Sequence, residues 1–300
     1  MTLDFDLSRV DTVSFGIGRD EGDAQAFVLV PTDSRVQAAL TDMAADTWEV
    51  MRGITDTPPL YEPSEKHGSI EYVHIPVSSD LAIRMKQLHE AVNVPVDSGA
   101  LSDLGSLFCY FAMMTDEGGR RLTALRRAAH FKGIVKSRLI RVVTDALTLV
   151  EDRVFKLDND FDLLIDGQTV HILRPAGFEF AGKLQEEILK AAPGNAAALQ
   201  LDLPYVDFES IHNYAGKHPR AARYLASIRG QKTKNISQEA LVDLCVATGV
   251  GVQIDGDRLI IDGGQELAFL EVLDRRRYQV NLVSDTPERF RASSRNKLDA

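Results

Sequence analysis

Residues 161–173 read FDLLIDGQTVHIL, and this stretch decides the fold class. Two apolar runs, 161–165 and 169–173, flank the dipeptide Asp166-Gly167, which favours a tight turn between antiparallel strands. The pattern therefore predicts a β-hairpin, with a further short strand just upstream at 155–157. We expect the following apolar side chains to fill the core of the sheet: Phe155, Leu157, Phe161, Leu163, Ile165, Val170 and Ile172.

Upstream of this hairpin, strand patterns alternate with helical ones. Residues 36–51 carry apolar side chains at spacings of three and four, which predicts a helix that stops at Gly53. A second helix is expected up to Ala91, and residues 121–128 fit a strand or a helix equally well. Further strands are predicted at 24–30, 70–77 and 107–114.

Downstream of the hairpin the chain becomes mostly helical. Pro175 ends the sheet and precedes a helix that is expected to run to about Ala192, before Pro193-Gly194. The segment 219–261, two helices followed by a hairpin, imitates the order of a winged helix-turn-helix. Further helices are predicted near 208–214, 219–229, 237–248 and 264–273, and strands at 250–254, 258–261 and 278–283.

Together these elements predict a mixed α/β (α+β) fold. Because residues 93–103 are rich in turn formers, we expect an acidic N-terminal α/β region over 1–103. A second domain is expected over 104–300, with a sheet at about 107–173 and a helical part with a hairpin at about 175–283. A length of 300 residues is consistent with two such domains.

Charge is the first indication of function, because it is strongly segregated. The net charge is −10, and residues 1–117 alone hold 7 Lys and Arg against 20 Asp and Glu. Residues 118–144 then hold eight basic residues and no acid, and residues 210–238 hold six and no acid. A third basic cluster lies at 275–297. Local basic patches of this kind allow an acidic protein to bind phosphates.

These patches would suit the phosphate backbone of DNA, and the sequence offers no motif for a catalytic group, a cofactor or a metal. Few aromatic residues are interleaved with the basic runs, with Phe131 and Tyr224 as the clear cases, which favours double-stranded DNA over single strands. The predicted DNA-binding residues are Arg120, Arg121, Arg126, Arg127, Lys132, Lys136 and Arg138, with Lys217, Arg220, Arg223, Lys232 and Lys234 as a second contact region.

Two alternative functions remain open on the sequence. Asp158, Asp160 and Asp162 alternate close to Asp166, which would suit a magnesium-dependent nuclease or phosphodiesterase. The basic faces would also suit a scaffold that binds an acidic protein or an anionic lipid.

The run FKLDNDFDLLIDGQTVHILRPAGFEF over 155–180 resembles the KwaB family of the Kiwa anti-phage defence system. The series RGQ, ALVDLCVATGV, IDGDRLIIDG and FLEVLDRRRYQV further downstream is similar to the C-terminal portion of that family, and 107–128 resembles its preceding hairpin. The resemblance covers roughly the last two-thirds of the chain.

The resemblance implies a DNA-binding effector that works with a KwaA-like transmembrane partner at the inner face of the membrane. The sequence itself has no secretory signal and no apolar stretch of about 18 residues, so a cytoplasmic protein recruited by that partner is expected. Pairing of the acidic and basic segments between chains makes a homo-oligomer, a dimer or larger, a further expectation. Cys109 and Cys245 are expected to be two buried thiols.

Overall fold

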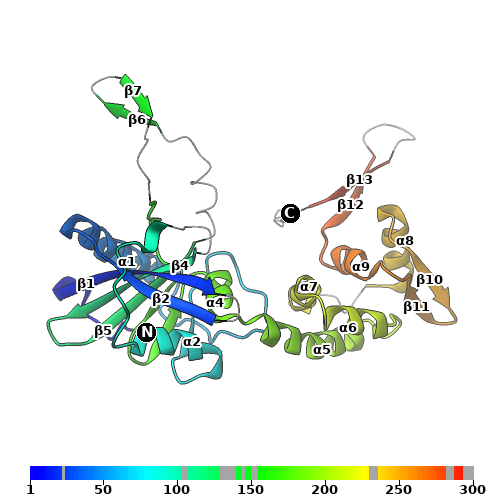
Figure 1. Cartoon of the computed structure of the whole chain (residues 1–300). Coiled ribbons are helices and arrows are strands. Elements are labelled where there is room, and N and C mark those ends of the chain that lie inside the picture. Colours follow the sequence, from blue (N-terminus) through cyan, green and yellow to red (C-terminus); the bar gives the residue numbers. More distant parts are fainter. Residues whose placement is uncertain are drawn as a thin grey trace. The chain divides into compact units, whose positions relative to one another are not determined.

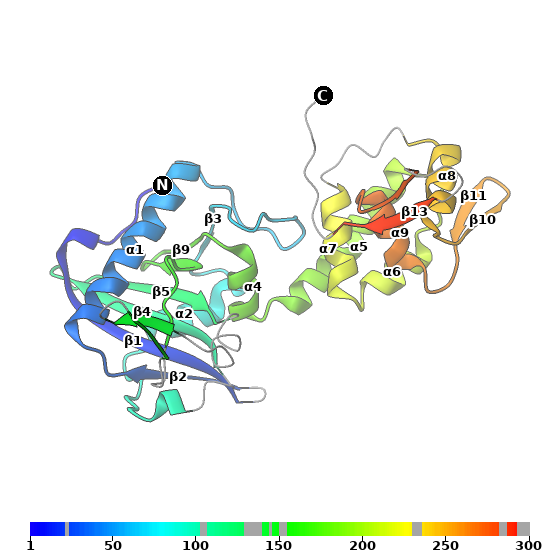
Figure 2. The same ribbon diagram turned by 90° about the horizontal axis from the view of Figure 1, so that it is seen from above.

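The computed structural model describes residues 1–21, 24–102, 107–128, 140–143, 146–149, 155–229, 236–281 and 287–292. The chain divides into two compact units, drawn in Figures 1 and 2. Unit 1 comprises Met1–Tyr61 and His67–Lys183, and unit 2 comprises residues 62–66 and Leu184–Ala300. The fold is mixed α/β, as predicted.

The described part of unit 1 is built on a seven-stranded sheet in which every neighbouring pair is antiparallel. The predicted hairpin lies within it, and Ile165 pairs with Val170 next to the turn. In spatial order the strands are β2 (Ala24–Val30), β1 (Val10–Glu21), β4 (Leu107–Asp116), β5 (Arg121–Arg127), β8 (Leu163–Ile165), β9 (Thr169–Ile172) and β3 (Val73–Pro76). A separate pair consists of β6 (Ile140–Val143) and β7 (Ala146–Leu149).

Helices cover the sheet of unit 1. Side chains alternate between the two faces of a strand, so Tyr110, Ala112 and Met114 share one face, and they form one buried cluster with Leu40 and Met43 of α1 (Ser34–Ile54). On β5, contacts are made by α2 (Ile83–Glu90) and α4 (Pro175–Gly182). Single 3₁₀ turns lie at η1 (Leu7–Arg9), η2 (Asp80–Ala82) and η3 (Ala100–Ser102).

Unit 2 is mostly helical. Its core joins side chains from all of its helices and from β11, among them Leu199, Leu225 and Phe269. The helices are α5 (Gln185–Asp202), α6 (Glu209–Ala215), α7 (Pro219–Arg229), α8 (Gln238–Thr248) and α9 (Glu266–Leu273). Two antiparallel ribbons complete the unit, β10 (Val252–Asp255) with β11 (Arg258–Ile261) and β12 (Arg277–Val280) with β13 (Glu288–Arg291).

The helix predicted from Pro175 to Ala192 is instead two helices. The chain turns at Lys183, which has a left-handed φ of 52°, and α5 then continues through Pro193 to Asp202. Proline removes one helical hydrogen bond, but Ile188, Ala192 and Leu199 bury one continuous face, and that burial offsets the loss.

Three other predictions can be compared with the structure. Residues 155–157 form no strand, although Phe155 and Leu157 pack against the core as expected. Residues 121–127 are a strand, which settles the ambiguous pattern there. The boundary expected near residue 103 falls inside unit 1, because β1 and β4 are neighbours in one sheet.

Candidate nucleic-acid interface

The described part of the first predicted basic region, Arg120 to Arg127, lies on and beside β5, and two of its arginines hold the fold together. The Arg120 side chain binds the carboxylate of Asp116 at 2.8 Å and that of Asp4 at 3.2 Å. Arg121 donates to the carbonyl oxygens of His89 and Ala91, both at 2.9 Å. These contacts tie β5 to the N-terminal segment and to the end of α2.

Arg126 is largely enclosed, with a side chain only 13% exposed. It binds Asp158 at 3.2 Å, Asp160 at 3.1 Å and Asp162 at 2.8 Å. Burial opposes the charge of Arg126, but the three aspartates outweigh it and raise the pKa of the guanidinium. Arg126 therefore serves as a shared counter-charge for three carboxylates within unit 1.

The same contacts bear on the aspartates considered for a nuclease. Asp160 is also bound by Arg174 at 2.7 Å, and burial raises the pKa of Asp162 despite its pairing with Arg126. Among the described residues there is no group of three or more His, Cys, Asp and Glu side chains placed to hold a metal ion. Asp158, Asp160 and Asp162 are therefore all paired with arginine side chains.

Arg127 lies next to this cluster. Its backbone N–H donates to Asp162 at 2.8 Å, and its guanidinium carbon lies 3.9 Å from the centre of the Phe180 ring, in cation–π geometry. Together with Arg126, it anchors the end of β5 between the aspartate cluster and α4.

Asp166, the fourth aspartate considered, belongs to a separate buried network. Its Oδ2 accepts from Nε2 of His171 at 3.0 Å, and Nδ1 of His171 then accepts from the Tyr72 hydroxyl at 2.8 Å. Burial opposes ionisation of Asp166, but the bond from His171 and backbone N–H bonds, one of them from Asp4, lower its pKa to about 2. Burial and the charge of Asp166 raise the pKa of Tyr72.

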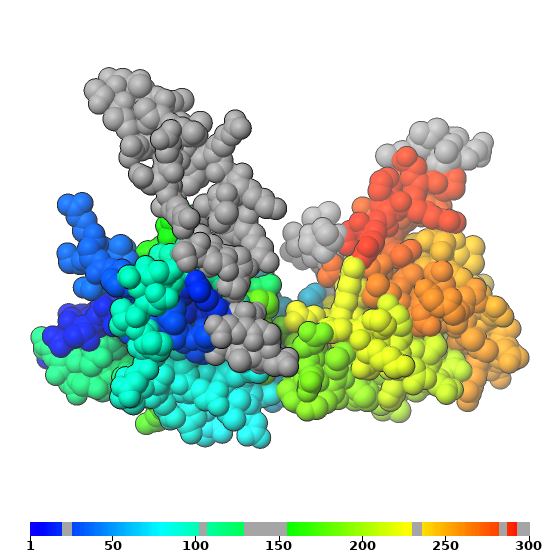
Figure 3. All heavy atoms as spheres, in the orientation of Figure 1, coloured from blue at the N-terminus to red at the C-terminus, as the bar shows by residue number. Residues whose placement is uncertain are grey.

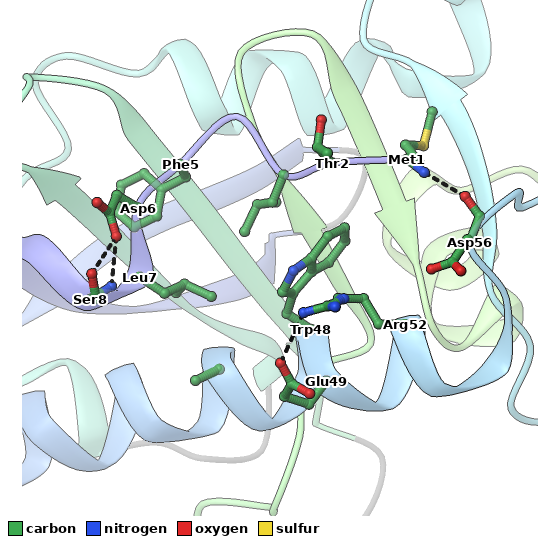
Figure 4. Close-up of a pocket in the computed structure, with 12 residues that line it drawn as sticks. Met1, Thr2, Phe5, Asp6, Leu7, Ser8, Trp48, Glu49, Arg52 and Asp56 are labelled. Atoms are coloured by element: carbon green, nitrogen blue, oxygen red, sulfur yellow. Dashed lines mark hydrogen bonds and ion pairs between the residues drawn. The ribbon is translucent and has the colours of Figure 1, made fainter.

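A pocket of about 640 Å³ lies between the N-terminal segment and α1. In Figure 4, Trp48 and Arg52 of α1 lie opposite Thr2 and Leu7. The charged lining is mixed, and Arg52 is already paired with Glu49 at 3.4 Å. The pocket therefore offers no surplus of positive charge for a phosphate.

The described part of the second predicted region lies along α7 and the turn before it. Lys217, Arg220 and Arg223 are all exposed, at three-residue intervals. Arg220 donates to the Tyr224 hydroxyl at 3.1 Å. Five predicted contacts, in both regions, lie outside the described residues: Lys132, Lys136, Arg138, Lys232 and Lys234.

Unit 2 brings Arg220 together with arginines from the far end of the chain. Glu271 of α9, whose side chain is 1% exposed, binds Arg220 at 3.2 Å, Arg277 at 3.0 Å and Arg291 at 2.6 Å. Arg220 and Arg291 are 55% and 47% exposed, so both also reach the surface. Three guanidinium groups thus share one buried carboxylate.

A fourth arginine extends this group. Arg276 binds Asp274, which also accepts a hydrogen bond from Ser227 of α7. The guanidinium carbons of Arg276 and Arg220 lie 5.2 and 5.6 Å from the centre of the Tyr224 ring. We call Arg220, Arg276, Arg277 and Arg291 the arginine cluster; its four positive charges exceed the two carboxylates by two.

The ribbon β12–β13 positions half of the arginine cluster. Arg277 and Arg291 are directly opposite each other in its register. Arg289 fastens the same ribbon to the end of α8 by donating to the carbonyl oxygens of Val246 and Ala247, where the negative end of the helix dipole favours a cation. The sequence shows these arginines as a third basic run, but it does not show that they meet Arg220.

The geometry defines a two-unit α/β protein whose second unit presents clustered arginines. A family model described as Kiwa protein KwaB-like matches residues 107–282, more than half of the chain, and the chain therefore belongs to the KwaB-like family of the Kiwa anti-phage defence system. This confirms the resemblance found in the sequence. No curated protein and no solved structure matches the chain.

Across the described ranges, every helix is too short or too polar to span a bilayer. The match begins at β4 and so covers the greater part of the sheet of unit 1 as well as the arginine cluster up to Arg277.

Proposed function

We propose that the chain is the DNA-binding effector of a Kiwa anti-phage defence system, and that it holds DNA by its phosphates with little sequence preference. The arginine cluster of unit 2 is the observation that carries this proposal. Arginine presents a planar fork of N–H donors that matches phosphate oxygens, and contacts to the phosphate backbone carry no base information.

The arginine cluster suits this role because Glu271 fixes three of its four members without cancelling their charge. A single buried carboxylate holds three guanidinium groups, so they are oriented before DNA arrives and lose little side-chain freedom on binding. Lys217 and Arg223 extend the positive surface along α7.

In unit 1, by contrast, the predicted contacts Arg120, Arg121 and Arg126 already bind aspartates or backbone carbonyls. A phosphate would have to compete with carboxylates for Arg126. We therefore centre the proposal on unit 2.

The proposal includes a KwaA-like transmembrane partner that recruits the chain to the inner face of the membrane. Membership of the KwaB-like family supports this part. A homo-oligomer would place several arginine clusters on one DNA molecule and increase avidity without new contacts.

A gel-shift titration on unrelated duplex DNA at several salt concentrations tests the proposal. We expect log affinity to fall linearly with log salt, by about 0.9 per phosphate contacted. The double variant Lys217→Glu/Arg223→Glu, which leaves the ion pairs of Glu271 in place, should weaken binding and reduce that slope.

The matched control is Arg9→Glu/Arg52→Glu in unit 1, which changes the net charge equally at two exposed positions. It should bind DNA as the unaltered chain does, apart from a small general effect of charge. Equal weakening by both double variants would show that net charge matters and not the surface of unit 2. No shift even at low salt would refute DNA binding.

A further inference from the structure

The pocket between the N-terminal segment and α1 has the size and the lining of a small-molecule site. Its volume of about 640 Å³ falls within the range of about 300–1,000 Å³ that such sites occupy. Leu3, Leu7 and Trp48 give it apolar walls, and Figure 4 shows the Trp48 indole projecting from α1 toward the N-terminal segment. In Figure 3 α1, coloured blue, lies at the surface of unit 1, and the side chains of Glu49 and Arg52 in the lining are 71% and 56% exposed. Small molecules can therefore enter from solvent.

Both walls of this pocket are attached to one buried network. Asp166 accepts a hydrogen bond from the backbone N–H of Asp4 in the N-terminal segment at 3.1 Å and another from His171 at 3.0 Å. Trp48 packs against His171 and Tyr72, with ring centres 5.3 and 6.1 Å away and nearly perpendicular planes. Because these contacts fix both the N-terminal segment and the indole, the pocket exists before a ligand arrives and little freedom is lost on binding.

Carboxylates outnumber cations among the side chains that line the pocket. The charged residues of the lining are Asp6, Glu49, Arg52 and Asp56. Two of the three carboxylates already have partners, since Glu49 pairs with Arg52 at 3.4 Å and Asp6 pairs with Arg9 at 3.7 Å. The lining therefore disfavours an anion, and it leaves Asp56 for a ligand.

Within the part of the chain that the structure describes, the Asp56 carboxylate forms no hydrogen bond or ion pair. The N-terminal amine binds the backbone carbonyl oxygen of Asp56 instead. Figure 4 places Asp56 and Glu49 on either side of Arg52, on the same side of the pocket as Trp48. The pocket thus combines the carboxylate of Asp56 with an indole, the ring that attracts cations most strongly.

We propose that this pocket binds a small organic cation, an amine or a quaternary ammonium group on an apolar body. The apolar part packs against Leu3, Leu7 and Trp48, and the positive group lies between the indole and the carboxylate of Asp56. Cation–π attraction is larger in a partly enclosed site than at an exposed one. The site belongs to unit 1, and the inference goes beyond the proposed function and does not depend on it.

Trp48 reports directly on this pocket, because it is the single tryptophan of the chain. The test titrates the full chain with benzyltrimethylammonium chloride and follows tryptophan fluorescence, with sodium chloride at equal ionic strength as the reference. We expect a saturable change with a midpoint at about 1 mM or below. Benzyl alcohol, which has the ring without the charge, should bind at least about ten-fold more weakly.

Two single substitutions test the lining. Asp56→Asn removes the charge at an exposed position, so it keeps the fold; it should weaken binding of the cation at least about five-fold and leave binding of benzyl alcohol unchanged. Ala45→Leu places a larger side chain in the pocket and should abolish the saturable change. The matched control is Asp42→Asn, which removes a carboxylate from an exposed position of α1 outside the lining and should bind the probe as the unaltered chain does.

Several outcomes would overturn the proposal. A response that does not saturate, or that sodium chloride reproduces, would show that the pocket holds no cation. Equal affinity for benzyl alcohol would make it a purely apolar cavity, and equal weakening by Asp56→Asn and Asp42→Asn would reveal a general effect of charge. None of these measurements involves DNA, so failure of this proposal and failure of the proposed function are distinguished.

Discussion

Replacement of Arg126 by alanine should destabilise unit 1 and leave the DNA surface of unit 2 intact. The guanidinium is 13% exposed and is the partner of three aspartates, the nearest being Asp162 at 2.8 Å. The Asp162 side chain is only 4% exposed, so its charge would remain buried without this partner. Removing one member of a buried ion pair costs about 3–5 kcal/mol, and we expect a loss in that range at pH 7.

The single tryptophan of the chain makes this loss measurable. Trp48 lies on α1 and contacts the sheet of unit 1 through Tyr72 and His171, so its fluorescence reports the unfolding of that unit in urea. With a slope of about 2 kcal/mol per molar urea, the midpoint should fall by about 1.5–2.5 M. Protonation of Asp162 removes the unpaired charge, so the loss should shrink as the pH is lowered through its raised pKa.

Asp162→Asn in the Arg126→Ala background is the control, because it removes the stranded charge and should recover part of the lost stability. A midpoint shift below about 0.5 M, or a double variant less stable than Arg126→Ala alone, would refute the assignment of Arg126 as a structural counter-charge. A charge reversal at Arg126 would accordingly confuse loss of fold with loss of DNA binding.

Three further measurements address other parts of the chain. The pKa of Asp166 is lowered to about 2 from an ordinary value of 3.8, so its ionised form contributes about 2 kcal/mol to the stability of the fold. This contribution is present above about pH 4 and is lost as the pH falls through 2. Asp166→Asn should remove it at neutral pH, and the unfolding free energy of the variant should depend less on pH in the acid range. Cys109 and Cys245 are fully buried, and burial raises the pKa of Cys245 to about 12. A thiol reagent at pH 8 should therefore label the two thiols only after denaturant is added. Labelling of the native chain would contradict this packing. Gly249 has a left-handed φ of 73°, and a Cβ there would lie 2.6 Å from Nη1 of Arg289. Gly249→Ala should therefore lower the free energy of unfolding by about 1 kcal/mol or more, which a thermal melt would measure. An unchanged melting temperature would show that the end of α8 tolerates the substitution.

Local sequence patterns predicted the central hairpin because its signal is contained in thirteen residues. Apolar runs on both sides of Asp166-Gly167 specify both strands and the turn, and the structure has β8 and β9 there. The end of the helix at Pro193 was predicted wrongly, because the proline rule is local while the buried face that carries α5 onward depends on the other helices of unit 2.

The candidate site was only partly predictable for the same reason. Charge counts identified Arg220 and Arg223, and they drew attention to the basic run that contains Arg277 and Arg291. They could not separate an arginine that faces solvent from one that neutralises buried aspartates, as Arg126 does. That distinction depends on ion pairs between residues more than thirty positions apart in the sequence, and charge counts contain no information about such pairs.

Residues 62–66 belong to unit 2, although the chain on both sides of them belongs to unit 1. Unit 2 is therefore not one continuous piece of chain. Asn195 of α5 donates to the carbonyl oxygen of Ser64 at 2.9 Å, and Arg229 of α7 donates to Asn195 at 3.0 Å. A fragment that starts at Leu184 would leave the buried amide of Asn195 without its acceptor. Any transplant of the C-terminal part into a related chain must therefore bring a compatible loop from the N-terminal half, so the two gene segments are expected to be inherited together.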